Sequence, residues 1–533
     1  MLRSLGRVVT ISVLMVLMVG MNVYALEQDQ EYSDPTVIEE ETKEFSITGK
    51  AGNGNDETPG EWYEGDVPEN PVPNAPVLLF VPGLNNTAQI FWEDNDMYET
   101  ALEAGYQTAF IQLNDAGGES ADMWDNGELL AEKIEEISVH FDNQPITIIA
   151  YSKGGVDTQT ALTYYGADDY VQNVITLSSP HHGSQLADLA YSSWAGWLAD
   201  LIGAKGDGTY SMQMGNMEAF RSQTDAEPLA YATPYYTLGG TSWGIVFSAN
   251  WFGGTYLSQY GSNDGVVTIA SSALPGGEEL AIGDWSHTTI RTGETFSVFE
   301  NYLMGTNHNG IKSSPWESWK DDEETSPLNS QWIYGGEILG VNEEAISISV
   351  EENVESIKLQ VLTSEEVDGF QLLNSNRENV PVEMTSYKNE EGIFKGAHSY
   401  FMTIEKPESG EWNLIMEGQE NTGYLLVADY DAPTKLIKSG VDYTHGESEL
   451  TYQLQVDQTQ VQVDSLTSTY QVTQSNNPSN KKTYHAVGDA SLSQHLNVNH
   501  SGEVYNITID VEGKTKAGER FKRTVVDSVY LDF

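Results

Sequence analysis

An apolar run that ends in a serine between small residues most constrains how this chain can fold. Residues 146–149 are apolar, residues 150–155 read AYSKGG, and residues 156–165 have the composition of a helix. This arrangement predicts a nucleophile elbow, in which a sharp strand-to-helix turn exposes a hydroxyl group above the edge of a sheet. Gly154 permits the turn. We therefore expect Ser152 to act as a nucleophile.

The segments around this turn alternate between two kinds of pattern. Further apolar runs predict buried strands, and apolar residues at helical spacing predict helices. Strands that alternate with helices form a mostly parallel sheet with helices on both faces. The expected strands are 76–81, 106–113, 146–151, 171–177, 235–238 and 279–282, and the expected helices are 96–104, 120–141, 156–165 and 297–303. We place this α/β catalytic domain at 67–310.

Residues 185–230 interrupt the alternation with an apolar, helix-like insertion. It is rich in leucine and tryptophan, including Trp194 and Trp197. We expect a lid or cap over the carboxyl edge of the sheet. A pair of core helices is the alternative interpretation of the same residues.

Beyond residue 310 the pattern changes to short alternating runs separated by turn residues, which is typical of antiparallel sheets. We expect a linker at 311–337 and two all-β sandwich domains at 338–432 and 433–533. Such modules commonly bind ligands or act as spacers and do not catalyse reactions. We therefore expect the catalytic residues to lie before residue 310.

The amino-terminal residues predict export. Residues 1–25 combine two arginines, an apolar core and small residues at the end, as in a secretory signal peptide, and no later stretch is long and apolar enough for a stable membrane anchor. Residues 26–66 are expected to be an acidic, flexible leader. The chain has no cysteine, so it has neither disulfides nor thiolate chemistry.

The charge of the chain excludes one class of partner. Its formal net charge is −55, and residues 61–310 contain few basic side chains, namely Lys133, Lys153, Lys205, Arg221 and Arg291. A nucleic-acid-binding protein needs clustered lysine and arginine, so this chain is not expected to be one. Strong self-repulsion of this kind is screened by salt, which suggests a saline or alkaline habitat.

Ser152 requires a base and an acid that orients the base. In one common chain order the nucleophile is followed by the acid and then by a histidine. His287, in Trp285-Ser286-His287, fits this order. Asp264, before a glycine that favours a tight turn, is the expected acid. Asp284 is the rival carboxylate.

A tetrahedral intermediate would need two backbone N–H donors. The first is expected from Lys153, directly after the nucleophile. The second is expected from the loop after the first strand, where Gly83 frees the backbone of Leu84. Asn85 is the alternative donor. No motif indicates a cofactor or a metal.

Together these motifs resemble those of secreted bacterial lipases and esterases of the α/β-hydrolase superfamily. The likeness covers about residues 60–305, and the motif SPHHGS at 179–184 belongs to it. The resemblance implies Ser152 as nucleophile, Asp264 as acid and His287 as base, with His181 and His182 in structural roles. Pro82 stands where the family usually has histidine, and Lys153 where methionine or glutamine is commoner.

The resemblance implies a secreted serine carboxylic-ester hydrolase acting on acyl esters, a triacylglycerol lipase or esterase. A polyester depolymerase of the polyhydroxyalkanoate type is one alternative, with the β domains gripping an insoluble polymer or lipid aggregate. A surface-binding protein with a vestigial hydrolase domain is another. An acyltransferase would use the same catalytic residues.

Overall fold

The computed structural model describes residues 32–38, 57–117, 120–244, 248–305, 328–338, 345–389, 392–443, 449–488, 492, 494–497 and 502–531. The predicted signal peptide at 1–25 lies outside these residues, as does most of the expected linker. Residues 34–533 form one compact unit.

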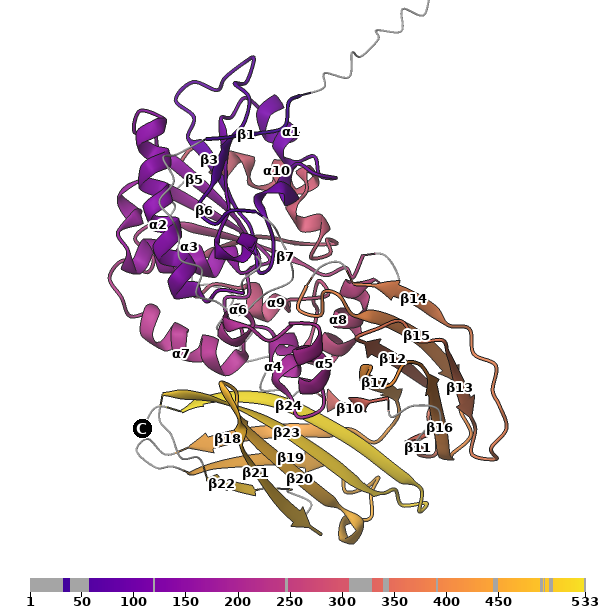
Figure 1. Cartoon of the computed structure of the whole chain (residues 1–533). Coiled ribbons are helices and arrows are strands. Elements are labelled where there is room, and N and C mark those ends of the chain that lie inside the picture. The colour runs from indigo at the N-terminus through magenta and orange to yellow at the C-terminus, as the bar shows by residue number, and fades with distance from the viewer. Residues whose placement is uncertain are drawn as a thin grey trace, which may run out of the picture. The chain divides into compact units, whose positions relative to one another are not determined.

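The catalytic part is built on one mixed sheet (Figure 1). Its strands are β1 (Thr36–Val37), β2 (Trp62–Glu64), β3 (Val77–Val81), β4 (Thr108–Ile111), β5 (Ile146–Tyr151), β6 (Val171–Leu177), β7 (Tyr235–Gly240) and β8 (Glu278–Gly283). They lie in the order β1-β2-β4-β3-β5-β6-β7-β8, and β3 to β8 are parallel. The central strands are buried on both faces, which explains their unbroken apolar sequences.

Helices connect these strands, four of them near the positions that the sequence predicts and two, at 249–257 and 269–272, where it predicts none. They are α1 (Met97–Glu103), α2 (Met123–His140), α3 (Gly154–Tyr164), α8 (Ala249–Leu257), α9 (Ile269–Ser272) and α10 (Phe296–Phe299). Short 3-10 helices occupy 88–91, 114–117, 167–169, 258–260, 289–291, 293–295, 300–302 and 463–465. Helix α2 begins where the Asp122 carboxylate accepts hydrogen bonds from the backbone N–H groups of Trp124 and Asp125, at 2.8 and 2.9 Å.

The predicted insertion is helical. It contains α4 (Gln185–Tyr191), α5 (Gly196–Leu201), α6 (Asp207–Ser211) and α7 (Met214–Thr224). Its outer side contacts the carboxyl-terminal strands, where Ser528 accepts a hydrogen bond of 2.8 Å from the backbone N–H of Gly215. Trp194 likewise donates from its indole to Asp510. The insertion therefore lies between the hydrolase sheet and the β-rich region, and its apolar residues have partners on both sides.

The β-rich region consists of two pairs of antiparallel sheets. In the first module, β10 (Gln331–Glu337), β17 (Gly423–Asp431), β12 (Ser356–Thr363), β15 (His398–Glu405) and β14 (Thr385–Lys388) form one sheet, and β11 (Ile346–Val350), β16 (Gly410–Glu417) and β13 (Gly369–Leu373) form the other. Along β16 buried and more exposed residues alternate, as expected when one face of the sheet is exposed to solvent.

The second module has the same kind of architecture. One sheet contains β22 (Gln494–Asn497), β19 (Glu449–Val456), β18 (Leu436–Tyr443) and β9 (Leu328–Asn329), and the other contains β21 (Asn477–Val487), β20 (Thr467–Gln474), β23 (Glu503–Lys514) and β24 (Arg520–Leu531). The fold class predicted from the sequence, an α/β hydrolase followed by all-β modules, is confirmed.

Two expected boundaries differ from the structure. Strands β9 and β10 lie inside the range 311–337 that the sequence analysis assigned to a linker. Strands β1 and β2 lie inside the range 26–66 assigned to a flexible leader, and they extend the hydrolase sheet at its β4 edge. Strands of two or three residues are too short to show an alternating pattern, so the sequence gives no signal for β1, β2 or β9.

The hydrolase and the β modules share one apolar cluster. It joins Leu186 and Phe252 of the hydrolase to Ile333 and Phe394 of the first module and Val526 of the second, all of them buried. The β modules are therefore packed against the catalytic part rather than tethered to it.

Candidate active site

Ser152 occupies the sharp turn between β5 and α3. Its φ is 53°, in the left-handed region, and its backbone N–H donates to Leu177 on the neighbouring strand at 2.9 Å. A non-glycine residue in this conformation is strained, and such strain concentrates at functional sites. A Cβ added to Gly154 would lie 2.4 Å from the carbonyl oxygen of Pro82, so only glycine fits there. The turn thus has the backbone geometry expected of a nucleophile elbow.

The structure brings Ser152, His287 and Asp264 together from three separate loops. Nε2 of His287 lies 3.0 Å from Oγ of Ser152, and Nδ1 of His287 lies 2.7 Å from Oδ2 of Asp264. The backbone N–H of His287 also donates to the Asp264 carbonyl at 2.9 Å. The imidazole is therefore held between a hydroxyl group on one side and a carboxylate on the other.

Asp264 is fixed by its own turn. Its Oδ1 accepts hydrogen bonds from the backbone N–H groups of Val266 and Val267 at 2.9 and 2.8 Å, and its side chain is fully buried. Gly265 has a φ of 98°, a conformation that favours glycine. The rival carboxylate, Asp284, is exposed to solvent. The carboxylate that meets the histidine is the one expected from the sequence.

The two predicted oxyanion donors belong to residues at the same site. Leu84 and Lys153 both line the cavity that contains Ser152 and His287, and within the described part of the chain neither backbone N–H has a hydrogen-bond acceptor. The alternative donor, Asn85, gives its N–H to Oδ1 of Asp115 at 3.0 Å. The backbone N–H of Asn85 is therefore already hydrogen-bonded, so Leu84 is the better candidate for the second oxyanion donor.

The other histidines among the described residues of the catalytic part, His140, His181 and His182, are held by other partners. His181 is buried with Nε2 3.3 Å from Oγ1 of Thr176, and burial holds its pKa well below the ordinary value, so it stays neutral. The backbone N–H of His182 donates to Ser271. His140 lies beside Glu64 at 2.9 Å.

The cavity beside Ser152 is small and mostly apolar. Its volume is about 40 Å³, and its lining includes Met212, Val266 and Ile393. Ile393 belongs to the first β module and is buried. The wall of the cavity therefore combines side chains of the hydrolase with a side chain of the first β module.

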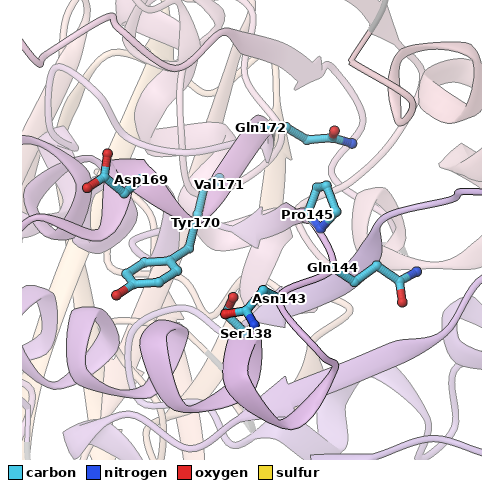
Figure 2. Close-up of a pocket in the computed structure, with 8 residues that line it drawn as sticks. All are labelled: Ser138, Asn143, Gln144, Pro145, Asp169, Tyr170, Val171 and Gln172. Carbon is cyan, nitrogen blue, oxygen red and sulfur yellow. The ribbon is translucent and has the colours of Figure 1, made fainter.

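A larger hollow of about 410 Å³ lies where β5 and β6 begin (Figure 2). Asn143, Gln144 and Tyr170 are among its lining residues. Ligands of parallel α/β sheets bind at the carboxyl ends of the strands, and this hollow is at the opposite edge. We assign it no catalytic role.

The described residues contain neither a metal-binding cluster nor a helix that could span a membrane. In that part of the chain, no cluster of three or more histidine, aspartate or glutamate side chains has the geometry to hold a metal ion. Among the helices of the same residues, none is both long and apolar enough to cross a bilayer.

Comparison with solved structures identifies the family. The chain is 32% identical to the lipase BlEst2 of Bacillus licheniformis in its propeptide form, over 89% of this chain and 98% of that one, with a TM-score of 0.74. The chain belongs to the family of this lipase. It is therefore an α/β hydrolase and a serine ester hydrolase. No protein-family model and no curated protein sequence matches it.

Other matches in the lipase group are less extensive. The mature form of BlEst2 is 48% identical over 46% of this chain and 99% of its own length, with a TM-score of 0.44. Lipase B of Aspergillus fumigatus is 20% identical over 32% of this chain and 38% of its own length, with a TM-score of 0.25.

The structure also brings to the site residues that the sequence analysis did not select. Asp115 and Asn126 lie buried beneath it, and Ile393 comes from a different module. No motif or spacing marks any of the three, because each reaches the site only through the tertiary fold. The motif NDAG at 114–117 resembles an ordinary turn.

Proposed function

We propose that this ester hydrolase works through an acyl-enzyme on Ser152, with His287 as the base and Asp264 as the residue that orients it. The observation that supports this most is the continuous contact from Ser152 Oγ to His287 Nε2 and from His287 Nδ1 to Asp264. A neutral serine is a poor nucleophile until an adjacent imidazole accepts its proton.

The chemistry follows from these contacts. Ser152 Oγ attacks the carbonyl carbon of the ester, its proton moves to His287 Nε2, and the carbonyl oxygen becomes an oxyanion that accepts from the N–H groups of Leu84 and Lys153. The intermediate then expels the alcohol, which takes the proton from the imidazolium. Water, deprotonated by His287, attacks the acyl-enzyme, and the acid leaves as Ser152 recovers its proton.

The substrate class follows from the lining of the site. Leu84, Met212 and Val266 are apolar, so they suit an acyl chain. The net charge of −55 disfavours strongly anionic substrates. We infer that the substrate is an uncharged carboxylic ester of a lipid, and more specifically that it is a triacylglycerol.

The first test compares wild type with Ser152→Ala on p-nitrophenyl esters of increasing acyl length. We expect activity in wild type, its loss in the variant, and labelling of Ser152 by a fluorophosphonate. Full activity in Ser152→Ala would overturn the assignment. Addition of a primary alcohol separates a hydrolase from an acyltransferase, since the latter forms a new ester instead of the free acid.

We also propose that the β modules keep this enzyme latent. Gly392 and Ile393 of the first module line the cavity around Ser152, and the space left is about 40 Å³. The Bacillus licheniformis lipase that is matched over 98% of its length was described in a propeptide form. We infer that this part of the first β module covers the mouth of the site.

Ile393→Ala tests this cover. Shortening Ile393 should enlarge the cavity and raise kcat/KM on a short soluble ester. Ile348→Ala is the matched control, because Ile348 is equally apolar, buried on β11 of the same module and absent from the cavity lining. Equal effects of the two variants on kcat/KM would contradict the proposal that the first β module covers the site. If the modules instead bind a polymer, limited proteolysis should lower activity on an insoluble polyester and leave activity on the soluble ester unchanged.

We propose finally that the enzyme is secreted, since residues 1–25 have the pattern of a signal peptide. Amino-terminal sequencing of the exported protein tests this, with cleavage after Ala25 as the expected result. Retention in the cell with an intact amino terminus would contradict it.

A further inference from the structure

A chain of buried polar side chains runs beneath the elbow and ends at the loop that faces it. Nζ of Lys153 lies 2.7 Å from Oδ1 of Asp157. Asn126 Nδ2 donates to Oδ2 of Asp157 at 3.0 Å and to Oδ2 of Asp115 at 2.7 Å. Asp115 Oδ1 accepts from the backbone N–H of Asn85 at 3.0 Å. One set of bonds therefore connects the residue after Ser152 to the residue after Leu84.

The burial of this network is nearly complete. Lys153, Asp157 and Asp115 are each 1% exposed and Asn126 is 0% exposed. Burying charged groups costs free energy that pairing seldom repays, and apolar replacements of similar volume are often neutral or stabilising. Stability alone therefore gives a weak reason for these four side chains to lie here.

The position of the network gives a better reason. Asn85 has a φ of 57°, and its N–H bond to Asp115 fixes the peptide unit directly after Leu84. The same loop is close to the nucleophile, since a Cβ on Gly83 would lie 2.7 Å from Cβ of Ser152. On the other side, the Lys153–Asp157 pair holds the first turn of α3, where the Lys153 backbone lies.

We propose that Asp115 and Asn126 are positioning residues of the oxyanion hole, which lock the Leu84 loop and the Lys153 turn at the spacing a tetrahedral intermediate needs. This inference rests on the proposed function. Neither side chain touches the substrate. Each acts through a backbone N–H group that does, and the network makes the two donors move together.

Two reference values set an upper limit on the expected effect. Removing one oxyanion donor costs about 10²–10³ in kcat. Misplacement by about 1 Å costs on the order of 10². Loosening a donor without removing it should therefore lower kcat by about 10- to 100-fold. KM should change little, because the ground-state carbonyl is bound less strongly by these donors than the oxyanion is.

The experiment compares Asn126→Ala with Asn173→Ala in the full chain, assayed on p-nitrophenyl acetate before and after limited proteolysis. Asn173 on β6 is a matched control, since it is also 0% exposed and its Nδ2 donates to the carbonyl of Tyr302 at 2.9 Å. Both variants should lower Tm. Only Asn126→Ala should lower kcat by about 10- to 100-fold with KM within about twofold of wild type.

A second series concerns Asp115. Asp115→Asn keeps a neutral acceptor for the Asn85 N–H, whereas Asp115→Ala removes it, so kcat should fall in the order wild type, Asn, Ala. Affinity for an alkylboronic acid, which forms a tetrahedral adduct, should fall in the same order. If Asn126→Ala fails to fold, the near-isosteric Asp115→Asn provides the comparison.

The results below distinguish a failure of this inference from a failure of the proposed function on which it rests. Folded Asn126→Ala or Asp115→Ala with kcat within twofold of wild type, while Ser152→Ala is inactive, would overturn the positioning role alone. Activity that persists in Ser152→Ala would instead overturn the proposed function. A parallel loss of kcat in Asn173→Ala would also overturn the positioning role, because it would show a general effect of core damage.

Discussion

The side-chain amide of Asn506 donates a hydrogen bond of 2.8 Å to the backbone carbonyl of Asp188. Asn506 lies on β23 of the second β module and Asp188 on α4 of the hydrolase insertion. The Asp188 carboxyl group is 1% exposed, and its Oδ1 accepts from the backbone N–H of Met214 at 3.2 Å. Burial raises the pKa of Asp188 to about 8, with Asp527 adding to the rise and Lys438 opposing it.

This shift predicts a stability that falls with pH. The pKa of Asp188 is higher in the folded chain than the value of about 3.9 in an unfolded chain. The folded state therefore binds the proton more tightly, and the stability this gives at low pH is lost as pH rises from about 4 to about 8. Asp188→Asn keeps an acceptor for Met214 and cannot ionise. Its Tm at pH 8 should exceed that of wild type, by about 1 °C for each kcal/mol regained in a unit of this size.

Asp200→Asn is the control for that measurement. Asp200 lies on α5 of the same insertion, and its side chain is 65% exposed. Thermal melts between pH 5 and pH 9 should show a smaller pH dependence in Asp188→Asn and an unchanged one in Asp200→Asn. Identical curves for wild type and Asp188→Asn would refute the prediction.

A second prediction concerns the carboxylate beside His287. Asp264→Asn should lower kcat by about 10⁴ with the fold intact, because the amide favours the wrong tautomer of the imidazole. Asp284→Asn should leave kcat close to wild type, since Asp284 is exposed and lies outside the contact with His287. The reverse pattern would mean that Asp284 is the acid.

A third prediction follows from the close approach of the Leu84 loop to the elbow. In Gly83→Ala the new Cβ would lie 2.7 Å from Cβ of Ser152 and 3.1 Å from the carbonyl oxygen of Tyr151. The loop must move, so kcat should fall by about 10² or more. Gly369→Ala on β13 is the control, since a Cβ there meets nothing within 4 Å. Normal kcat in Gly83→Ala would show that the loop has room to shift without affecting catalysis.

The fourth prediction concerns salt. At a net charge of −55 the carboxylates repel one another, and added salt screens this repulsion. Tm should therefore rise between low salt and molar NaCl. An uncharged osmolyte at matched osmolality separates screening from general exclusion effects. A Tm that stays constant across the NaCl series would count against the prediction.

Much of the catalytic fold could be predicted from local patterns. Unbroken apolar runs gave β3, β5 and β6 within a residue or two, because central strands of a parallel sheet are buried on both faces. The positions of Ser152, Asp264 and His287 could also be predicted, because each residue lies in a short turn motif. The structure places His287 in contact with both Ser152 and Asp264.

The rest depends on contacts between distant parts of the chain. The carboxylate of Asp115 resembles one more acid in an acidic chain until the fold buries it beside Asn126. Ile393 stands in a β module, and nothing near it in the sequence indicates a hydrolase site. The expectation of separable domains came from the change in pattern near residue 310. That change in pattern does not predict the apolar cluster that the hydrolase and the β modules share.

The shared apolar cluster has a consequence for the order of synthesis. Val526, on the last strand, packs in the same cluster as Leu186 and Phe252. A ribosome makes these hydrolase residues long before it makes Val526, so the growing chain presents an unfinished apolar surface until β24 emerges. Contacts this distant in sequence also form slowly. The moment at which this core closes is therefore set by the synthesis of β24 rather than by completion of the hydrolase sequence.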